Sequence, residues 1–341
     1  MARIILGIGT SHSPQLQLPP DEWPMRANAD RRNQRLFYQG RYVAYPELLE
    51  IREDQHFERE ITPEKTQARW DACQQAIAHL GATLARVAPD VLIIVGDDEH
   101  ELFLDDNLPA ISVFWGDLVE DAPPEETEMD RANGLYTTPV ANAPRERVSH
   151  PAERSLGRHL IDRLVGEGFD IAACNALPAG SPQGTVAHPL HTVGHAFHYV
   201  YRRLLHNQVP PHVPIFLNTY FPPNQPSVSR CFELGRGLRK AIESWDEDKR
   251  VAVIASGGLS HFVIEEELDQ HIIEGLRHQD ATKLTDLPSS RFNSGTSEIR
   301  SWIVLGGAMA DDGLEMELVD YVPCYRTEAG TGCAMTFATW Q

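Results

Sequence analysis

The chain has 341 residues, 42% of them hydrophobic and 23% charged, which is enough for one large domain or two modest ones with a sizeable core. Asp and Glu number 49 against 30 Lys and Arg, giving a formal net charge of −19. Such a surface repels phosphate backbones and anionic lipids, so we expect neither nucleic acid nor a membrane as partner. The five cysteines form no CxxC pair, and no apolar run suits a signal peptide or a membrane helix, which favours a reduced, cytoplasmic protein.

The first segment predicts a buried strand that ends at a histidine. Residues 3–8 form an aliphatic run, and the chain then passes through Gly9 into Thr-Ser-His-Ser-Pro, which contains His12. Ligands of open α/β sheets bind at the carboxyl ends of strands. His12 is therefore a candidate site residue, although a histidine that only hydrogen-bonds in a loop is equally compatible with this segment alone.

Residues 15–57 form a long polar segment with several aromatic side chains. A loop of this length is uncommon unless it has a function or structure of its own, so we expect an ordered cap with a short helix near 46–52. Disorder is the alternative, but the aromatic density argues against it. Five of its arginines suggest a clamp for an aromatic carboxylate, although each could equally pair with a surface acid: Arg26, Arg31, Arg32, Arg35 and Arg41.

Strands and helices alternate along the rest of the chain. Thr62 and Pro63 have the character of an N-cap and first helical residue, predicting a helix to about residue 87. The alternation predicts an α/β fold in which a mostly parallel or mixed central sheet is flanked by helices, as one domain over 1–341 with the cap inserted at 15–57. We expect further strands at 90–95, 110–115, 169–174, 213–217 and 250–255, helices at 151–167 and 227–245, a loop over 117–147, and a helical last third with a helix at 299–309.

Four segments, most of them at predicted strand ends, carry side chains that can bind a metal. Two neutral imidazoles and one carboxylate on one side of an ion, with open positions opposite, are typical of Fe(II) centres that use oxygen. Scattered histidines are common, so this composition alone is weak evidence. The segments are His12, the acidic run 97–101 with His100, the group His188, His191, His195 and His198, and His261 with Glu265, Glu266 and Glu267.

Five motifs occur in an order that resembles the LigB-type (class III) extradiol ring-cleavage dioxygenases. The resemblance is strongest to the long single-chain branch with the 3-O-methylgallate and gallate dioxygenases, and it extends to the protocatechuate-type β-subunit. It implies a non-haem Fe(II) enzyme that cleaves a catecholic aromatic acid of the gallate, 3-O-methylgallate or protocatechuate type with O₂. The motifs are GIGTSHSP, GDDEHE, GHAF, LNTYFPP and SGGLSHFVIEEELD.

The resemblance also implies roles for individual residues. It places the first metal-binding histidine at His12, the metal carboxylate at Glu266, five residues after the histidine of GGLSH, and the catalytic acid/base at His195. It further implies that the segment 15–57 closes the site in cis, as a small helical subunit does in the two-subunit relatives.

The second histidine ligand is ambiguous. A gapless match puts Glu99 where the family has histidine, and His100 follows one residue later. Successive strand side chains point to opposite faces, so only one of them faces the metal unless the turn bends. Ligand chemistry favours His100, strict spacing favours Glu99, and His56 in the cap is a third candidate. A site with one histidine and two carboxylates would be harder and would favour Mn(II) or another ion.

Further residues are expected around the substrate. Asp97 and Asp98 are expected to orient a ligand rather than to bind the metal. We expect a homodimer, the commonest closed assembly. The rival functions are a catalytically inactive or zinc-holding binding protein and a metal-dependent hydrolase on the same fold. The candidate substrate-binding residues are Ser11, His191, Asn218, Thr219, Ser260 and His261.

Overall fold

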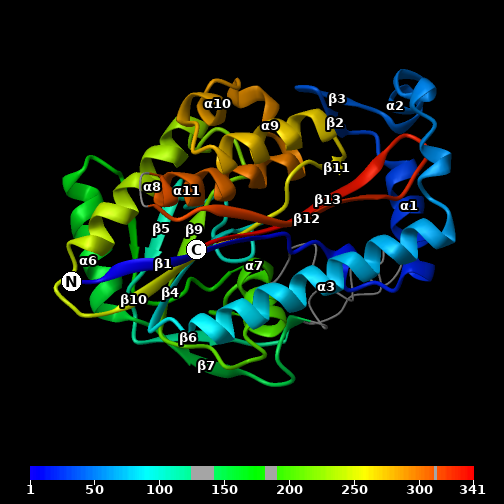
Figure 1. The fold of residues 1–341 in the computed structure, drawn as a ribbon. Coiled ribbons are helices and arrows are strands. Elements are labelled where there is room, and N and C mark those ends of the chain that lie inside the picture. Colours follow the sequence, from blue (N-terminus) through cyan, green and yellow to red (C-terminus); the bar gives the residue numbers. More distant parts are fainter. Residues whose placement is uncertain (124–141, 181–189, 311–312) are drawn as a thin grey trace.

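The computed structural model describes residues 1–341 except 124–141, 181–189 and 311–312. Within the described part, nine strands form one mixed sheet with the order β11-β13-β1-β10-β4-β9-β5-β8, and β12 pairs with β13. Helices cover both faces of this sheet (Figure 1). The predicted α/β class is thus confirmed.

Four neighbouring strands at the centre of the sheet are parallel. They are β1 (Arg3–Thr10), β10 (Arg250–Ser256), β4 (Val91–Asp97) and β9 (His212–Leu217). Because they are parallel, their carboxyl ends lie along one edge of the sheet. Both faces of a parallel sheet are covered by helices, which explains why every residue of β4 is buried.

The side chains of β4 divide between two apolar cores. Val91, Ile93 and Val95 belong to one core, and Leu92 and Ile94 belong to the other, as the alternation along a strand requires. The first core includes residues of α6 (Arg154–Gly166), α8 (Val228–Glu243) and α11 (Ile299–Met309), and the second includes residues of α3 (Pro63–Val87).

The predicted boundaries of these helices are close to the observed ones. The Thr62 side chain accepts a hydrogen bond from the Lys65 amide and so caps α3 as expected. On the opposite face, α8 and α11 approach backbone to backbone. A Cβ at Gly235 would lie 2.0 Å from the Val304 carbonyl oxygen, so only glycine permits this packing.

The last third of the chain is not predominantly helical, which corrects the sequence-based expectation. It contains α9 (Glu266–Arg277), α10 (Ala281–Thr285) and α11, but it ends in two ten-residue strands, β12 (Met316–Tyr325) and β13 (Thr331–Trp340). All ten residues of β13 are buried between β1 and β12, so no alternation of polar and apolar residues marks this strand. A short strand, β11 (His261–Val263), pairs with its other end.

The segment predicted as a loop over 117–147 begins with a strand. β6 (Leu118–Asp121) pairs with β7 (Val148–Pro151), and much of the chain between them lies outside the described residues. β5 (Ile111–Phe114) runs antiparallel to β9 and parallel to β8 (Ala172–Cys174) at the sheet edge.

Residues 15–57 contain regular structure. They form α1 (Trp23–Arg32), a hairpin of β2 (Leu36–Tyr38) and β3 (Arg41–Val43), and α2 (Tyr45–Ile51), which confirms the short helix expected near 46–52. Arg52 attaches this segment to the main body, since its guanidinium donates to the carbonyls of Ala329, Gly330 and Ile264. We refer to residues 15–57 as the cap. All five cysteines are free and buried, and no helix among the described residues could cross a bilayer.

Candidate metal centre and active site

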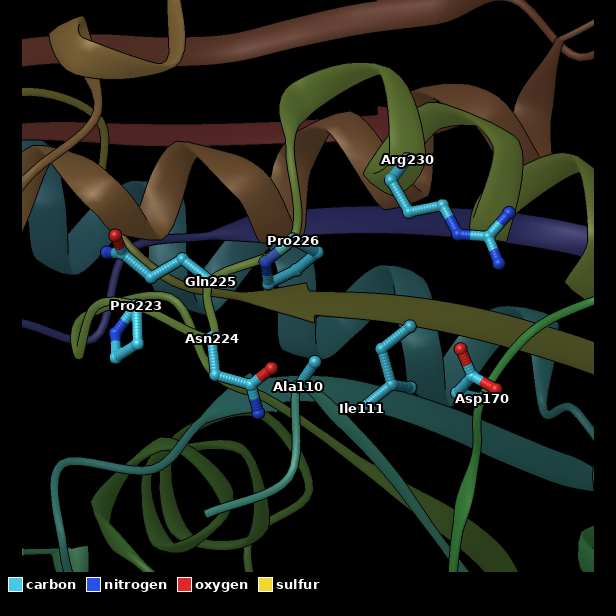
Figure 2. A pocket seen from close by; sticks show the side chains of 8 residues that line it. All are labelled: Ala110, Ile111, Asp170, Pro223, Asn224, Gln225, Pro226 and Arg230. Carbon is cyan, nitrogen blue, oxygen red and sulfur yellow. The ribbon is translucent and has the colours of Figure 1, made fainter. Parts of the chain in front are cut away.

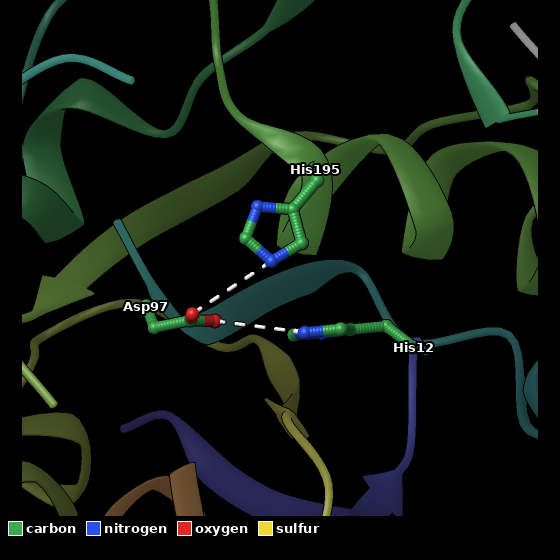
Figure 3. Close-up of side chains that lie close together, drawn as sticks. All are labelled: His12, Asp97 and His195. Carbon is green, nitrogen blue, oxygen red and sulfur yellow. Dashed lines mark ion pairs between the residues drawn. The ribbon is translucent and has the colours of Figure 1, made fainter. Parts of the chain in front are cut away.

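Two histidines converge on one carboxylate at the carboxyl edge of the sheet. His12 follows β1, Asp97 ends β4, and His195 begins α7 (His195–Tyr199). Nε2 of His12 lies 3.8 Å from Oδ1 of Asp97, and Nε2 of His195 lies 3.7 Å from Oδ2 (Figure 3). One donor atom from each residue lies within 4.8 Å of the others, so the three could share one ion.

Two further carboxylates join this group. Glu298, the last residue of a short 3-10 helix (Ser294–Glu298), places Oε2 3.4 Å from Nε2 of His12. Glu99 forms a second donor set with Asp97 and Glu298, again within 4.8 Å. The two sets share Asp97 and contain oxygen and imidazole donors, which suit a divalent first-row ion. We call His12, Asp97, Glu99, His195 and Glu298 the donor cluster.

The surroundings of the Asp97 carboxylate indicate whether a metal ion fits the donor cluster. Its carboxylate is 1% exposed, and neither oxygen has a hydrogen-bond partner among the described residues. Burial, reinforced by the charge of Glu298, raises the pKa of Asp97 well above its usual range. A buried carboxylate without hydrogen bonds is costly, and a bound cation removes that cost. The donor cluster therefore fits a divalent metal.

His12 is oriented to present a lone pair to this centre. Ser256 donates its hydroxyl to the carbonyl of Ala196 at 2.8 Å, so Nδ1–H of His12 donates to Ser256 Oγ at 3.0 Å. Nε2 is then the unprotonated nitrogen that faces Asp97 and Glu298. Burial lowers the pKa of His12 to about 4, which keeps the imidazole neutral, as a metal ligand must be.

His195 has a carboxylate behind it. Its Nδ1–H donates to Oε2 of Glu101 at 2.9 Å, and its backbone N–H donates to Oε1 of the same carboxylate at 2.8 Å. Burial opposes the charged form, but the carboxylates of Glu101 and Asp97 outweigh it and raise the pKa of His195 well above the usual value. A Cβ at Gly194 would lie 1.9 Å from Oε2 of Glu101, so glycine is required for this approach.

His261 forms a hydrogen bond with the carboxylate of Glu298. Its Nδ1–H donates to the Leu259 carbonyl at 2.7 Å, and Nε2–H donates to Oε1 of Glu298 at 2.9 Å. Both ring nitrogens donate, which is consistent with an imidazolium: burial opposes the charge, but Glu298 raises the pKa of His261 to about 10. The Glu298 carboxylate also accepts the amide of Gly258 at 2.6 Å. Although burial alone would raise it, the pKa of Glu298 is lowered to about 2 by His261 and His12.

The structure does not bring Glu266 or His100 to this centre. Glu266 is an exposed first residue of α9, and its carboxylate accepts the hydroxyl of Tyr325. His100 has a φ of +61° that turns the chain, and its ring stacks on Phe221 with centroids 3.5 Å apart. Neither belongs to a donor set among the described residues. His56, the third alternative, is exposed beside Glu58.

Glu99, the alternative ligand that strict spacing favours, and Asp97 both lie in a donor set. Asp97 was expected to orient a ligand but lies in the middle of the donor cluster. Asp98 shapes the following turn, because its carboxylate accepts the amides of Leu102 and Phe103. Sequence reasoning missed Glu298, although a glutamate directly before a predominantly apolar helix could have indicated a buried carboxylate.

The predicted substrate-binding residues have mixed surroundings. His261 lies against Glu298, as described above. Ser11 accepts the Thr336 amide, Ser260 donates to Asp269, and Asn218 brackets the backbone of Phe221, so these three side chains hold local structure. His191 is exposed and its Nδ1 contacts the Leu177 carbonyl. Thr219 keeps a buried hydroxyl without a hydrogen-bond partner among the described residues.

His198 and His188 belong to the same predicted group as His195. His198 lies outside the donor cluster. His198 pairs with Asp121 at 2.9 Å, on the side of α7 toward β6, and Asp121 also contacts His150 at 3.3 Å. His188 lies outside the described part of the chain.

A separate hollow of 190 Å³ lies where the loop after β9 meets β5 (Figure 2). Its lining contains one carboxylate and one guanidinium, those of Asp170 and Arg230, and otherwise apolar or amide side chains. Arg230 also donates to the Gly168 carbonyl and lies over the Phe169 ring. The lining lacks a metal-binding set, so this hollow does not compete with the donor cluster as the active site.

An α/β fold with imidazole and carboxylate donors gathered at the carboxyl ends of its parallel central strands defines a candidate metal-dependent enzyme. Residues 57–334 match the family described as the catalytic LigB subunit of aromatic ring-opening dioxygenase. The match covers most of the chain, and the protein therefore belongs to the LigB family.

Curated relatives are distant. The chain is 32% identical over 96 residues to a gallate dioxygenase of Pseudomonas putida, covering 25% of this chain and 28% of that protein. It is 26% identical over 192 residues to a 2,3-dihydroxyphenylpropionate/2,3-dihydroxicinnamic acid 1,2-dioxygenase of Comamonas testosteroni, covering 56% of this chain and 49% of that protein. The chain thus spans less than half the length of either relative.

A solved structure of an uncharacterized protein from Escherichia coli K12 superposes with a TM-score of 0.44 at 13% identity, covering 78% of this chain and 91% of that chain. This likeness is too weak to carry a conclusion about function.

Proposed function

We propose that this protein is an Fe(II)-dependent extradiol dioxygenase that cleaves the ring of a catecholic aromatic acid, of the gallate, 3-O-methylgallate or protocatechuate type, with O₂. The observation that carries the proposal is the buried carboxylate of Asp97, which has no hydrogen-bond partner among the described residues, faces His12 and His195, and shares a donor set with Glu298 in a LigB-family chain. The names of the distant relatives support ring-cleaving chemistry but leave the ring substituents open.

The metal ligands in this proposal are His12, Glu298 and a carboxylate from Asp97 or Glu99. They replace the set of His12, His100 and Glu266, because the latter two side chains lie elsewhere. One imidazole with two carboxylates is a harder donor set than two imidazoles with one carboxylate, so the site should bind Mn(II) as well as Fe(II). A bound iron would supply the redox chemistry that lets dioxygen react with a catecholate.

His195 is the proposed acid/base. Glu101 holds its Nδ1–H, so Nε2 is the nitrogen that faces the donor cluster. A cation held by Asp97 would offset part of the negative charge that favours the imidazolium, so that Nε2 could take up a proton released from a ring hydroxyl while Glu101 holds Nδ1–H. The same proton can later return to the cleaved product. Glu101 is a positioning residue in this scheme, because it acts through His195.

The cap is proposed to close the site in cis. Its helix α1 is tied to the β12–β13 hairpin by an ion pair between Arg31 and Glu328 at 2.9 Å and by a buried pair between Asp30 and Arg326. These contacts fix the cap to the turn between β12 and β13, and the far end of β13 pairs with β1, the strand that leads to His12.

The test is anaerobic reconstitution with Fe(II), followed by oxygen uptake and absorbance measurements with gallate, 3-O-methylgallate and protocatechuate. We expect stoichiometric oxygen uptake and a yellow ring-fission product from at least one of them. Tight iron binding without turnover of any catechol would contradict the proposal and favour a binding protein. Retained zinc with esterase or amidase activity would favour a hydrolase instead.

A further inference from the structure

The hydroxyl of Ser256 lies between the proposed metal ligand His12 and the helix that carries His195. Ser256 is the last residue of β10 and is fully buried. Its Oγ lies 3.0 Å from Nδ1 of His12 and donates its own hydrogen to the carbonyl of Ala196 at 2.8 Å. Ala196 follows His195 directly in α7. A single hydroxyl group therefore contacts both the ligand and the helix that begins with the proposed acid/base.

The direction of these two hydrogen bonds follows from the number of hydrogens. A serine hydroxyl has one hydrogen, and the Ala196 carbonyl can only accept, so this hydrogen points to Ala196. The bond to His12 is then donated by the ring nitrogen Nδ1. Since a neutral imidazole carries one N–H, Nε2 keeps its lone pair and faces the carboxylates of Asp97 and Glu298. Ser256 thus selects one of the two tautomers of His12.

The neighbouring strand ends hold α7 in the same place. β10 lies between β1 and β4, and Ser256 pairs with Thr10 on one side and with Gly96 on the other. The Thr10 hydroxyl lies 3.2 Å from the hydroxyl of Tyr199, the last residue of α7. Gly96 leaves room for the methyl group of Ala196, because a Cβ at Gly96 would lie 2.9 Å from it. The helix is therefore seated on three strand ends, and Ser256 supplies the polar contact nearest to its first residue.

We propose that Ser256 is a positioning residue that fixes the tautomer of His12 and the place of His195 through one hydroxyl group. The rings of His12 and His195 lie edge to face with centroids 4.7 Å apart, so a shift of either ring changes the distance between the metal ligand and the acid/base. A polar partner behind a metal-binding histidine orients the ring and strengthens metal binding. The consequences for catalysis rest on the proposed function, whereas the tautomer is a property of the metal-free protein.

The first test measures the tautomer of His12 directly. Two-bond proton–nitrogen correlation spectra of metal-free protein with isotope-labelled histidine distinguish the protonated from the unprotonated ring nitrogen, and His12→Gln assigns the signal. We expect Nδ1–H with an unprotonated Nε2 in the wild type and a mixture of tautomers in Ser256→Ala. Ser256→Thr keeps the hydroxyl and should keep the wild-type tautomer. Ser112→Ala is the matched control, since Ser112 is another buried strand serine that donates to a carbonyl, that of Ala172.

The second test measures metal binding and turnover. In Ser256→Ala the dissociation constant of Mn(II), measured by electron paramagnetic resonance of the free ion, should rise by about 10-fold. At saturating Fe(II), kcat should also fall by about 3- to 10-fold, the net value of one neutral hydrogen bond, because the Ala196 carbonyl has lost its donor. Ser256→Thr should restore both values, and Ser112→Ala should change neither.

The two tests separate the role of Ser256 from the proposed function. An unchanged His12 tautomer in Ser256→Ala would overturn that role, as would equal losses of metal affinity and kcat in Ser256→Ala and Ser112→Ala. If the wild type turns over no catechol, the proposed function fails, while the tautomer and the Mn(II) affinity still decide the role of Ser256. Turnover together with an unchanged tautomer removes only the role of Ser256.

Discussion

Both carboxylate oxygens of Glu101 accept hydrogen bonds from His195. Oε2 accepts Nδ1–H at 2.9 Å, and Oε1 accepts the backbone N–H at 2.8 Å. The two bonds fix the ring orientation and the tautomer at once, because the proton on Nδ1 is held and Nε2 is left to face Asp97. The orientation and the pKa of His195, the proposed acid/base, therefore depend on Glu101, a residue from the turn after β4.

Replacing Glu101 by Gln should therefore affect catalysis without affecting the metal. The amide removes the negative charge that raises the pKa of His195, so the limb of the pH–rate profile that reports His195 should shift to lower pH. We expect kcat to fall by roughly 10- to 100-fold, a part of what acid/base catalysis contributes. Metal content, measured by plasma emission, should stay unchanged. Glu267→Gln, at an exposed position on α9, is the control. An unshifted pH profile would contradict the role of Glu101.

Gly194→Ala tests the same contact sterically. The added methyl would overlap Oε2 of Glu101, so the carboxylate must leave His195. Activity should fall as far as it does in Glu101→Ala. In a double-mutant cycle, the glycine substitution should cost little once Glu101 is already Ala, because the clash is gone. Additive losses in the kcat values of the double variant would show that Gly194 matters for another reason.

Asp97→Asn should weaken metal binding more than Glu266→Gln does. The amide keeps the shape of the side chain but removes the charge that faces His12 and Glu298. We expect the dissociation constant for Mn(II), measured by electron paramagnetic resonance of the free ion, to rise by about 10-fold or more. Glu266→Gln should leave it unchanged, since that carboxylate contacts Tyr325 instead. The reverse ranking would restore the assignment of Glu266 to the metal.

We expect His212, which lies outside the donor cluster, to make the free energy of unfolding depend on pH. It is fully buried at the start of β9, where Nε2 accepts the Tyr201 hydroxyl at 2.6 Å. Burial lowers its pKa to about 4, below the ordinary value of 6.5 in the unfolded chain. Between these values the unfolded state binds more protons, so the free energy of unfolding should fall as pH drops from 6.5 to 4, by up to about 3 kcal/mol.

Urea unfolding of the wild type at several pH values measures this slope. His212→Gln keeps a hydrogen-bonding side chain but cannot titrate, so its stability should depend less on pH over the same range. His79→Gln, at an exposed position on α3, should retain the wild-type slope. If the slopes of all three proteins coincide, His212 does not carry the effect.

The sequence predicted which edge of the sheet carries the site, but it did not predict every side chain that lies there. Strand periodicity predicted β1 and β4, and hence the positions of His12 and the acidic turn, because fully buried parallel strands are continuous apolar runs. The choice between Glu99 and His100 depended on whether the turn bends. In the structure His100 has a positive φ and its ring stacks on Phe221, whereas Glu99 joins a donor set, and the sequence pattern alone does not reveal that backbone angle.

Two other differences have a similar physical origin. Glu298 directly precedes the helix predicted at 299–309, and nothing in the sequence indicates that it ends a 3-10 turn that directs its carboxylate toward His12. The buried threonines of β13 suggest polar character, and only the pairing of this strand between β1 and β12 explains why they are inside.

The most direct measurement is an anomalous-scattering map of a crystal grown with Mn(II) under anaerobic conditions. The account predicts one strong peak about 2.0–2.2 Å from Nε2 of His12 and from carboxylate oxygens of Glu298 and of Asp97 or Glu99, ordinary lengths for such bonds. A peak at His100 or Glu266, or none at the strand ends, would contradict it.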